Sequence, residues 1–138
     1  MGSETLTHAE LQSARGGATI VNYNHEFFKL AGMAPPIEFT CHFSLVCDLS
    51  SAALGVHWRV EVEHGFEHHM QTLSHHVLRD ITDHENPGMV QVRGHLRNVL
   101  EWAVGLRREK FKEAIDMIAV KDVPYVGIST KRKRAVHS

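Results

Sequence analysis

Two segments of the chain alternate between apolar and polar residues, and this period of two limits the fold more than any other feature. From Ile37 to Cys47 every odd-numbered residue is apolar, and from Val56 to Val62 every even-numbered residue is apolar. Alternation over such lengths predicts strands with one buried face. With 48–55 as the connecting loop, we expect an antiparallel pair with one wet face. The residues expected to face water on the second strand are His57, Arg59, Glu61 and Glu63.

Helical periodicity follows the alternating segments. Apolar residues from Phe66 to Ile81 recur at three- and four-residue spacing, which predicts a helix over 66–82 that covers the apolar face of the sheet. A similar stripe predicts helical structure over 94–119. Gly105 lies inside that stripe, so the pattern fits one long kinked helix or two abutting helices.

Shorter elements are expected around this core. Thr7 and Glu10 have capping-box spacing and Gly16-Gly17 supplies a stop, so we expect a short peripheral helix over 8–15. Residues 18–23 are β-prone, and short strands are expected over 89–93 and 123–128. The fold class predicted is a single-domain α+β protein, an antiparallel β-hairpin or small sheet covered on one face by two or three helices. Its parts are a helical N-terminal extension (1–36), an α+β core (37–130) and a basic C-terminal tail (131–138).

The chain has two cysteines and no segment apolar enough to suggest a membrane span or a secretory leader. Cys41 and Cys47 lie six residues apart in one expected strand, roughly 20 Å at about 3.3 Å per residue. That separation is too large for a disulfide, and both fall on the apolar face, so buried thiols are expected. With no run of 18 apolar residues and no signal-peptide pattern, we expect a protein of the nucleus and cytoplasm that is not inserted in a membrane.

Charge is divided by position along the chain. Residues 1–92 carry four Lys/Arg against eleven Asp/Glu, whereas 93–138 carry eleven against five, and the formal net charge is only −1. Such asymmetry favours an acidic or basic partner, or another copy of the same chain. We therefore expect a homo-oligomer in which the acidic half of one copy meets the basic half of another.

The basic half contains two concentrations of positive charge. Lys131-Arg132-Lys133-Arg134 has the form that an import receptor or a nucleic-acid backbone, RNA or DNA, binds, although a solvated tail is the simple alternative. The second concentration lies on the expected helical segment, and its Arg and Lys members are candidate nucleic-acid contacts; it comprises Arg93, His95, Arg97, Arg107, Arg108, Lys110 and Lys112. Four of them, Arg93, Arg97, Arg108 and Lys112, project into a related sector if Gly105 does not break the helical phase. That sector predicts a phosphate-binding stripe, with an ordinary solvated helix face as the alternative.

Histidine is abundant, with 12 residues in 138, and six lie between 64 and 84. The segment His64-x-x-Glu67-His68 matches the pattern of inverted zinc peptidases, in which His64 and His68 would bind zinc and Glu67 would act as the base. Against this, Gly65 separates His64 from the expected helix, and no motif selects a third ligand. The histidines also predict pH-dependent association, because they gain positive charge between pH 7 and 5.5.

The sequence contains no other catalytic motif: no nucleophile elbow, no phosphate loop and no dinucleotide fingerprint. We therefore expect a non-enzymatic binding and assembly protein, without a cofactor, that enters the nucleus or contacts nucleic acid through its basic half. Two alternatives remain open, a zinc-dependent hydrolase at His64, Glu67 and His68, and a small structural or host-interaction protein of a virus.

Overall fold

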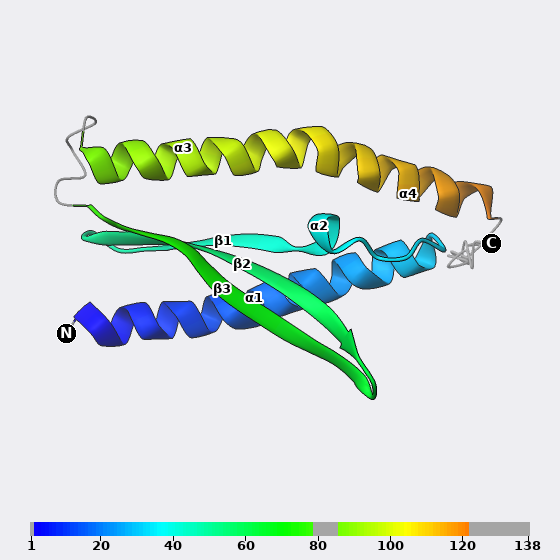
Figure 1. The fold of residues 1–138 in the computed structure, drawn as a ribbon, viewed down its shortest axis with the longest axis horizontal. Helices are drawn as coiled ribbons and strands as arrows, with labels where there is room; N and C mark the ends of the chain where they lie inside the picture. The colour runs from blue at the N-terminus through cyan, green and yellow to red at the C-terminus, as the bar shows by residue number, and fades with distance from the viewer. Residues whose placement is uncertain (1, 79–85, 122–138) are drawn as a thin grey trace, which may run out of the picture.

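The fold consists of a small antiparallel sheet between two long helical segments (Figure 1). The computed structural model describes residues 2–78 and 86–121, with side chains from His8 onward. The elements in chain order are α1 (Gly2–Leu30), α2 (Ile37–Thr40), β1 (His42–Cys47), β2 (Ser51–Val62), β3 (Gly65–Val77), α3 (Pro87–Trp102), η1 (Ala103–Arg107) and α4 (Arg108–Val120). The predicted α+β class with a small antiparallel sheet is confirmed. The structure adds that α1 and α3 lie on opposite sides of the sheet.

The sheet has three strands in the order β1-β2-β3, all antiparallel. The predicted pairing of the first two strands is correct, and His42 pairs with His57. Two boundaries differ from the prediction. Residues 37–40 form the short helix α2 after Pro36, so β1 begins at His42. The loop between the strands shrinks to a turn, in which Asp48 Oδ1 accepts hydrogen bonds from the backbone N–H groups of Ser50 and Ser51.

The prediction of a short N-terminal helix ending at Gly16-Gly17 is wrong, because α1 continues through both glycines to Leu30. Residues 18–23, expected to be β-prone, are helical. Gly17, Val21, His25 and Phe28 recur at helical spacing and are buried against the rest of the molecule. Packing of this stripe outweighs the local cost of two glycines in a helix, about 1 kcal/mol each. The helix α1 is therefore part of the core and not a peripheral element.

The prediction of a helix over 66–82 is also wrong: residues 65–77 form β3, the longest strand of the sheet, and 79–85 lie outside the described residues. Its residues pair with β2 from Gly65 opposite Val62 to Val77 opposite Ser51. A register shift between Leu54 and Gly55 leaves Leu73 as the extra residue of a bulge. Because most of β3 is exposed on both faces, burial does not impose a period of two on its sequence.

The helical segments α3, η1 and α4 form one continuous rod, which settles the question left open by Gly105. The π-turn η1 spans Ala103–Arg107, and the backbone remains right-handed helical on both sides of it. The strand expected over 89–93 is wrong, since α3 begins at Pro87. Pro87 suits the first helical position, and Asn86 Oδ1 accepts a hydrogen bond from Gly88 N at 3.0 Å.

The main apolar cluster joins the C-terminal half of α1 to α4. Phe28, Ala31 and Ala114 are fully buried there. The Phe111 ring stacks on Phe27 at 5.3 Å and meets Phe28 edge-on at 5.0 Å. The first and last helices of the described chain are thus held together by aromatic packing. The expected strand over 123–128 and the tail 131–134 lie outside the described residues.

Candidate interaction surfaces

The face of β2 that we expected to be wet is buried under α1. His57 and Arg59 are only 2% and 3% exposed, whereas Val62 on the opposite face is 43% exposed. The prediction of water-facing side chains is therefore wrong for His57 and Arg59, and it is correct for Glu61 and Glu63, which are exposed. The alternation itself is real, but α1 covers the polar face of β2. The sequence of β2 alone does not show which of its two faces will be buried, because that depends on where α1, a helix distant in the chain, packs.

His57 lies at the closest approach of α1 to the sheet. Its ring packs directly against Gly17, and its Nε2 lies 2.8 Å from Ser44 Oγ on β1. The rings of His42 and His57 are 5.8 Å apart. Burial, with a smaller effect of His42, lowers the pKa of His57, which keeps the imidazole neutral near pH 7. Because α1 closes over the His57 ring, the Ser44–His57 pair ties β1 to β2 and is not an open catalytic dyad.

Arg59 is the centre of a second polar contact between α1 and the sheet. Its Nη1 donates to Asn22 Oδ1 at 2.6 Å, and its Nη2 donates to Glu61 Oε1 at 2.8 Å. The guanidinium carbon lies 3.7 Å from the centre of the Phe66 ring, so the cation also stacks on β3. Glu26 adds a longer contact to Nη1 at 3.4 Å. Arg59 therefore connects α1, β2 and β3 through one side chain.

The carboxylate of Glu61 lies close to two side chains of α1 besides contacting this arginine. His25 Nδ1 lies 3.6 Å and Lys29 Nζ 3.9 Å from Glu61 Oε1. Loss of hydration would raise the pKa of Glu61, but the hydrogen bond and charge of Arg59 outweigh it and lower the pKa. Burial, followed by the charge of Arg59, lowers the pKa of His25. The cluster is thus an ionised contact that fixes α1 on the sheet.

Four of the predicted basic residues share the outer side of the helical rod. An i→i+5 turn such as η1 inserts about one residue, which changes the helical phase by roughly 100°. With that insertion, Arg93, Arg97, Arg108 and Lys112 fall within a sector of about 80°, and all four are exposed. Without the inserted residue the four would already fall within about 100°, so the π-turn only narrows the sector that they share.

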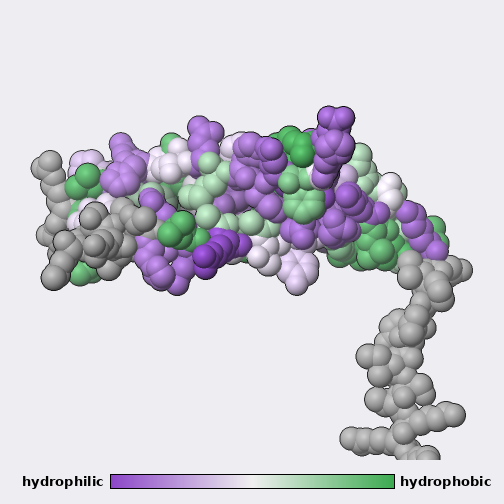
Figure 2. Space-filling view, turned by 90° about the horizontal axis from the view of Figure 1, so that it is seen from below, coloured by the Kyte–Doolittle hydropathy of each residue, from purple (hydrophilic) through white to green (hydrophobic). Residues whose placement is uncertain are grey.

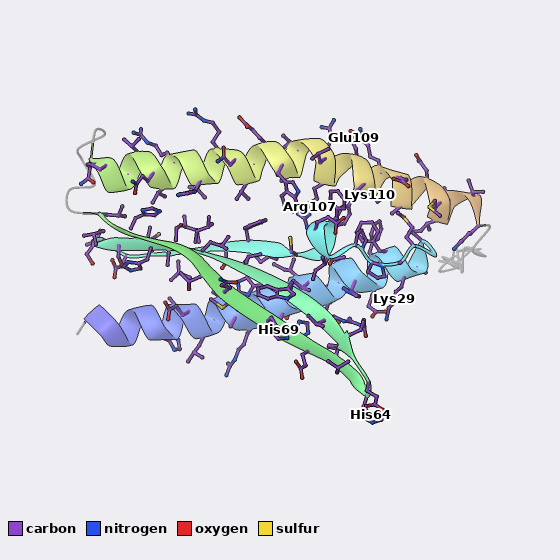
Figure 3. The ribbon with its side chains drawn as sticks, in the orientation of Figure 1. Lys29, His64, His69, Arg107, Glu109 and Lys110 are labelled. Atoms are coloured by element: carbon purple, nitrogen blue, oxygen red, sulfur yellow. The ribbon has the colours of Figure 1, made fainter. Side chains whose placement is uncertain are left out.

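Other members of the predicted basic set have local roles. Arg107 points toward α2, its Nε donates to Phe39 O at 3.3 Å, and its guanidinium lies 5.0 Å from the centre of the Phe111 ring. Figure 3 shows Arg107 directed inward from the rod and Glu109 directed away from it. Arg107 therefore packs against α2 and Phe111 and does not share the exposed sector of the other four arginine and lysine side chains. Lys110 pairs with Glu113 at 3.2 Å.

Acidic residues partly neutralise the α4 end of the basic side. Glu109 Oε1 lies 3.3 Å from Lys112 Nζ and 3.7 Å from Arg108 Nε. Exposed pairs of this kind contribute little to stability, at most about 1 kcal/mol, but they reduce the local positive charge.

The predicted zinc motif does not form the arrangement that such a site needs. His64 lies at the tip of the β2–β3 turn (Figure 3), and its side chain is 90% exposed. His68 and Glu67 are consecutive residues of β3, so their side chains leave opposite faces of the strand. In the described parts of the chain, no group of three or more His, Cys, Asp or Glu could hold a metal ion. The helical zinc geometry is absent because this segment is a strand.

An open groove lies between β1 and α3, with a volume of about 440 Å³. Its lining is mostly apolar and includes Phe43 and Trp102, whose rings meet edge-on at 5.4 Å. Cys41 also lines it, and burial raises the pKa of this thiol. The expectation of two buried thiols is half correct: both cysteines are free, but Cys47 is exposed.

Figure 2, which views the molecule from the α1 side, shows small hydrophobic areas among hydrophilic residues.

The outer edge of β3 is a further surface that sequence periodicity did not indicate. The strand order leaves this edge without a neighbouring strand among the described residues. Phe66, Met70, Leu73 and Val77 are 45%, 39%, 50% and 59% exposed along it. Glu67 is the only formally charged residue in β3 if its histidines are neutral. In Figure 1, β3 crosses in front of α1, and the tip of the β2–β3 hairpin projects beyond that helix on the side away from the helical rod.

Comparison with known proteins places the chain in a family without assigning it an activity. No curated protein and no solved structure shows significant similarity to it. Within the described residues, no helix is both long and apolar enough to cross a membrane. A family model described as a domain of unknown function, DUF7924, matches residues 1–115, which include α1, the whole sheet, α3 and most of α4. The chain belongs to the DUF7924 family.

Proposed function

We propose that this chain is a non-enzymatic binding and assembly domain that contacts nucleic acid through the outer side of the α3–α4 rod and through its basic tail. The observation that carries the proposal is the exposure of Arg93, Arg97, Arg108 and Lys112 within one sector of the rod, which is about 80° wide when η1 is counted as one inserted residue. Exposed cations along one side of a helical rod can contact backbone phosphates electrostatically, without selecting a base sequence.

Electrostatic contact of this kind has a measurable salt dependence. For duplex DNA, log K falls with log salt by about 0.9 for each phosphate neutralised, and by about 0.7 for single strands. A titration of the full chain with single- and double-stranded RNA and DNA at several salt concentrations therefore tests the proposal. Absence of binding at low salt would contradict it.

Matched variants locate the surface. Arg97→Gln should weaken duplex binding and reduce the salt slope by about 0.9. Arg15→Gln is the control. Arg15 is exposed on α1, so its substitution removes the same charge from the other side of the molecule. Equal effects of the two variants would show that net charge, and not the α3–α4 side, determines binding.

The tail Lys131-Arg132-Lys133-Arg134 supports nuclear entry as part of the same proposal. A chain truncated after Thr130, fused to a fluorescent protein, should lose nuclear enrichment that the full chain shows. The same truncation should lower nucleic-acid affinity if the tail contacts phosphate. Self-association completes the proposal, and the charge asymmetry between the two halves supports it.

A further inference from the structure

We propose that the outer edge of β3 pairs antiparallel with β3 of a second copy, which would extend the sheet to six strands; this deepens the self-association in the proposed function. Edge strands expose unpaired backbone N–H and C=O groups and normally carry protection such as lysines, proline or short length. β3 has 13 residues, more than twice the six of β1, and contains no Lys, Arg or Pro. Its protection consists of one acid, one bulge and, at the C-terminal end, the start of α3, where Gly88 packs against Val77 O and the rings of His76 and His95 stack at 5.3 Å.

Charge complementarity selects a second copy as the occupant. Gln71 is the central residue of β3, so full antiparallel overlap of two copies places Gln71 opposite itself and Gly65 opposite Val77. Counting along this register places Glu67 opposite His75 of the second copy. If the bulge at Leu73 is carried across the new pair, Glu67 lies opposite His76 instead. In both registers the single acid of each strand meets a histidine, and no two acids meet.

The exposed apolar side chains of β3 support the same pairing. Phe66 and Val77 lie near opposite ends of the strand and are 45% and 59% exposed. Full overlap brings Phe66 of one copy beside Val77 or His76 of the other, since the ends of the two strands meet. Aromatic and β-branched neighbours across a strand pair are favourable. Pairing would thus cover part of the exposed apolar surface of β3, mainly toward the hairpin end, because α3 already contacts Val77 O and His76.

The expected dimer is weak. A 13-residue edge supplies fewer residues than the 20–30 on each side of a typical stable interface. We therefore expect association in the micromolar range, visible as a concentration-dependent sedimentation coefficient of the full chain between about 1 and 200 µM, a span that brackets weak interfaces. The two-fold register permits a sharp test, because Gln71 of one chain lies opposite Gln71 of the other.

Gln71→Lys and Gln71→Glu should each abolish dimerisation, because each places two like charges directly opposite one another. An equimolar mixture of the two variants should restore it, because Lys then faces Glu. Gln12→Lys, on the exposed side of α1, adds the same charge away from β3 and should dimerise as the wild type does. Circular dichroism and the thermal midpoint confirm that each variant is folded.

The outcomes separate this inference from the proposed function. Dimerisation of the Gln71 variants equal to wild type, or failure of the mixture to recover, overturns the β3 pairing while leaving self-association through another surface intact. A wild-type chain that stays monomeric at 150 mM salt across the concentration range overturns both. Monomeric behaviour combined with a lower thermal midpoint for Gln71→Lys would show that another part of the same chain occupies the edge. Nucleic-acid binding, measured separately with Gln71→Glu, tests the α3–α4 surface alone.

Discussion

His57 on β2 packs its ring against Gly17 of α1, and no other residue type fits at position 17. A Cβ built there would lie 2.5 Å from Cγ and 2.7 Å from Cε1 of the imidazole. This contact gives a packing reason for a glycine in the interior of α1, where the helix crosses the sheet. One glycine is required by the close approach, while Gly16 next to it has open space on its outer side.

Gly17→Ala should therefore destabilise the protein. Overpacking against a buried ring costs about 1–3 kcal/mol, which exceeds the gain of up to 1 kcal/mol from better helix propensity. Gly16→Ala is the matched control and should stabilise by about 0.5–1 kcal/mol, because its Cβ meets no atom within 4 Å. Chemical denaturation of both variants measures the difference. Equal effects at the two positions would contradict the packing of α1 on His57.

Arg59→Met should lower the free energy of unfolding by about 2–3 kcal/mol, because it removes buried hydrogen bonds made by a charged group. Asn22→Ala in a double-mutant cycle should show a coupling of about 0.5–3 kcal/mol with Arg59. The control Arg108→Met removes an exposed arginine, 61% exposed, and should change stability by no more than about 0.5 kcal/mol. Additive effects of Arg59 and Asn22 would exclude a direct contact between α1 and β2 at this site.

Stability should fall as pH decreases from about 6.5, the ordinary histidine value. Burial lowers the pKa of His25, His42 and His57, so the unfolded chain takes up protons before the folded one. Their contribution is present above pH 6.5 and is lost as pH falls through the lower folded-state pKa values. Thermal midpoints measured from pH 7.5 to 5 should show this decline. His57→Gln should reduce the decline, whereas His64→Gln at the exposed hairpin tip should not.

Phe28→Ala should cost about 3–5 kcal/mol, because Phe28 is fully buried and contacts the Phe111 ring of α4. Leu49→Ala is the comparison, since Leu49 is 80% exposed and should change stability by no more than about 0.5 kcal/mol. Unfolding followed by denaturant titration distinguishes the two. A small effect at Phe28 would argue against aromatic packing between α1 and α4.

The candidate surfaces were only partly predictable from the sequence. The shared sector of the four exposed basic residues follows from helical spacing, whereas the π-turn that narrows this sector was not indicated by the sequence pattern. Arg107 looks like its basic neighbours in the sequence, and only the position of α2 turns it inward. Gly17, Val21 and His25 recur at helical spacing, which is consistent with a longer α1. Two of the three are not large apolar residues, so the stripe does not stand out as a hydrophobic pattern.

The sequence by itself determined the α+β class, the antiparallel pairing of β1 with β2 and the helical nature of the 94–119 segment, because period-two and helical patterns reflect local backbone geometry. Tertiary structure decided the rest. It made β3 a strand through its pairing with β2, although its apolar spacing is helical. It also decided which face of β2 is buried, because Gly17, Asn22 and His25 bring α1 onto the polar residues His57 and Arg59. Contacts between residues far apart in the chain outweigh local preference at these positions.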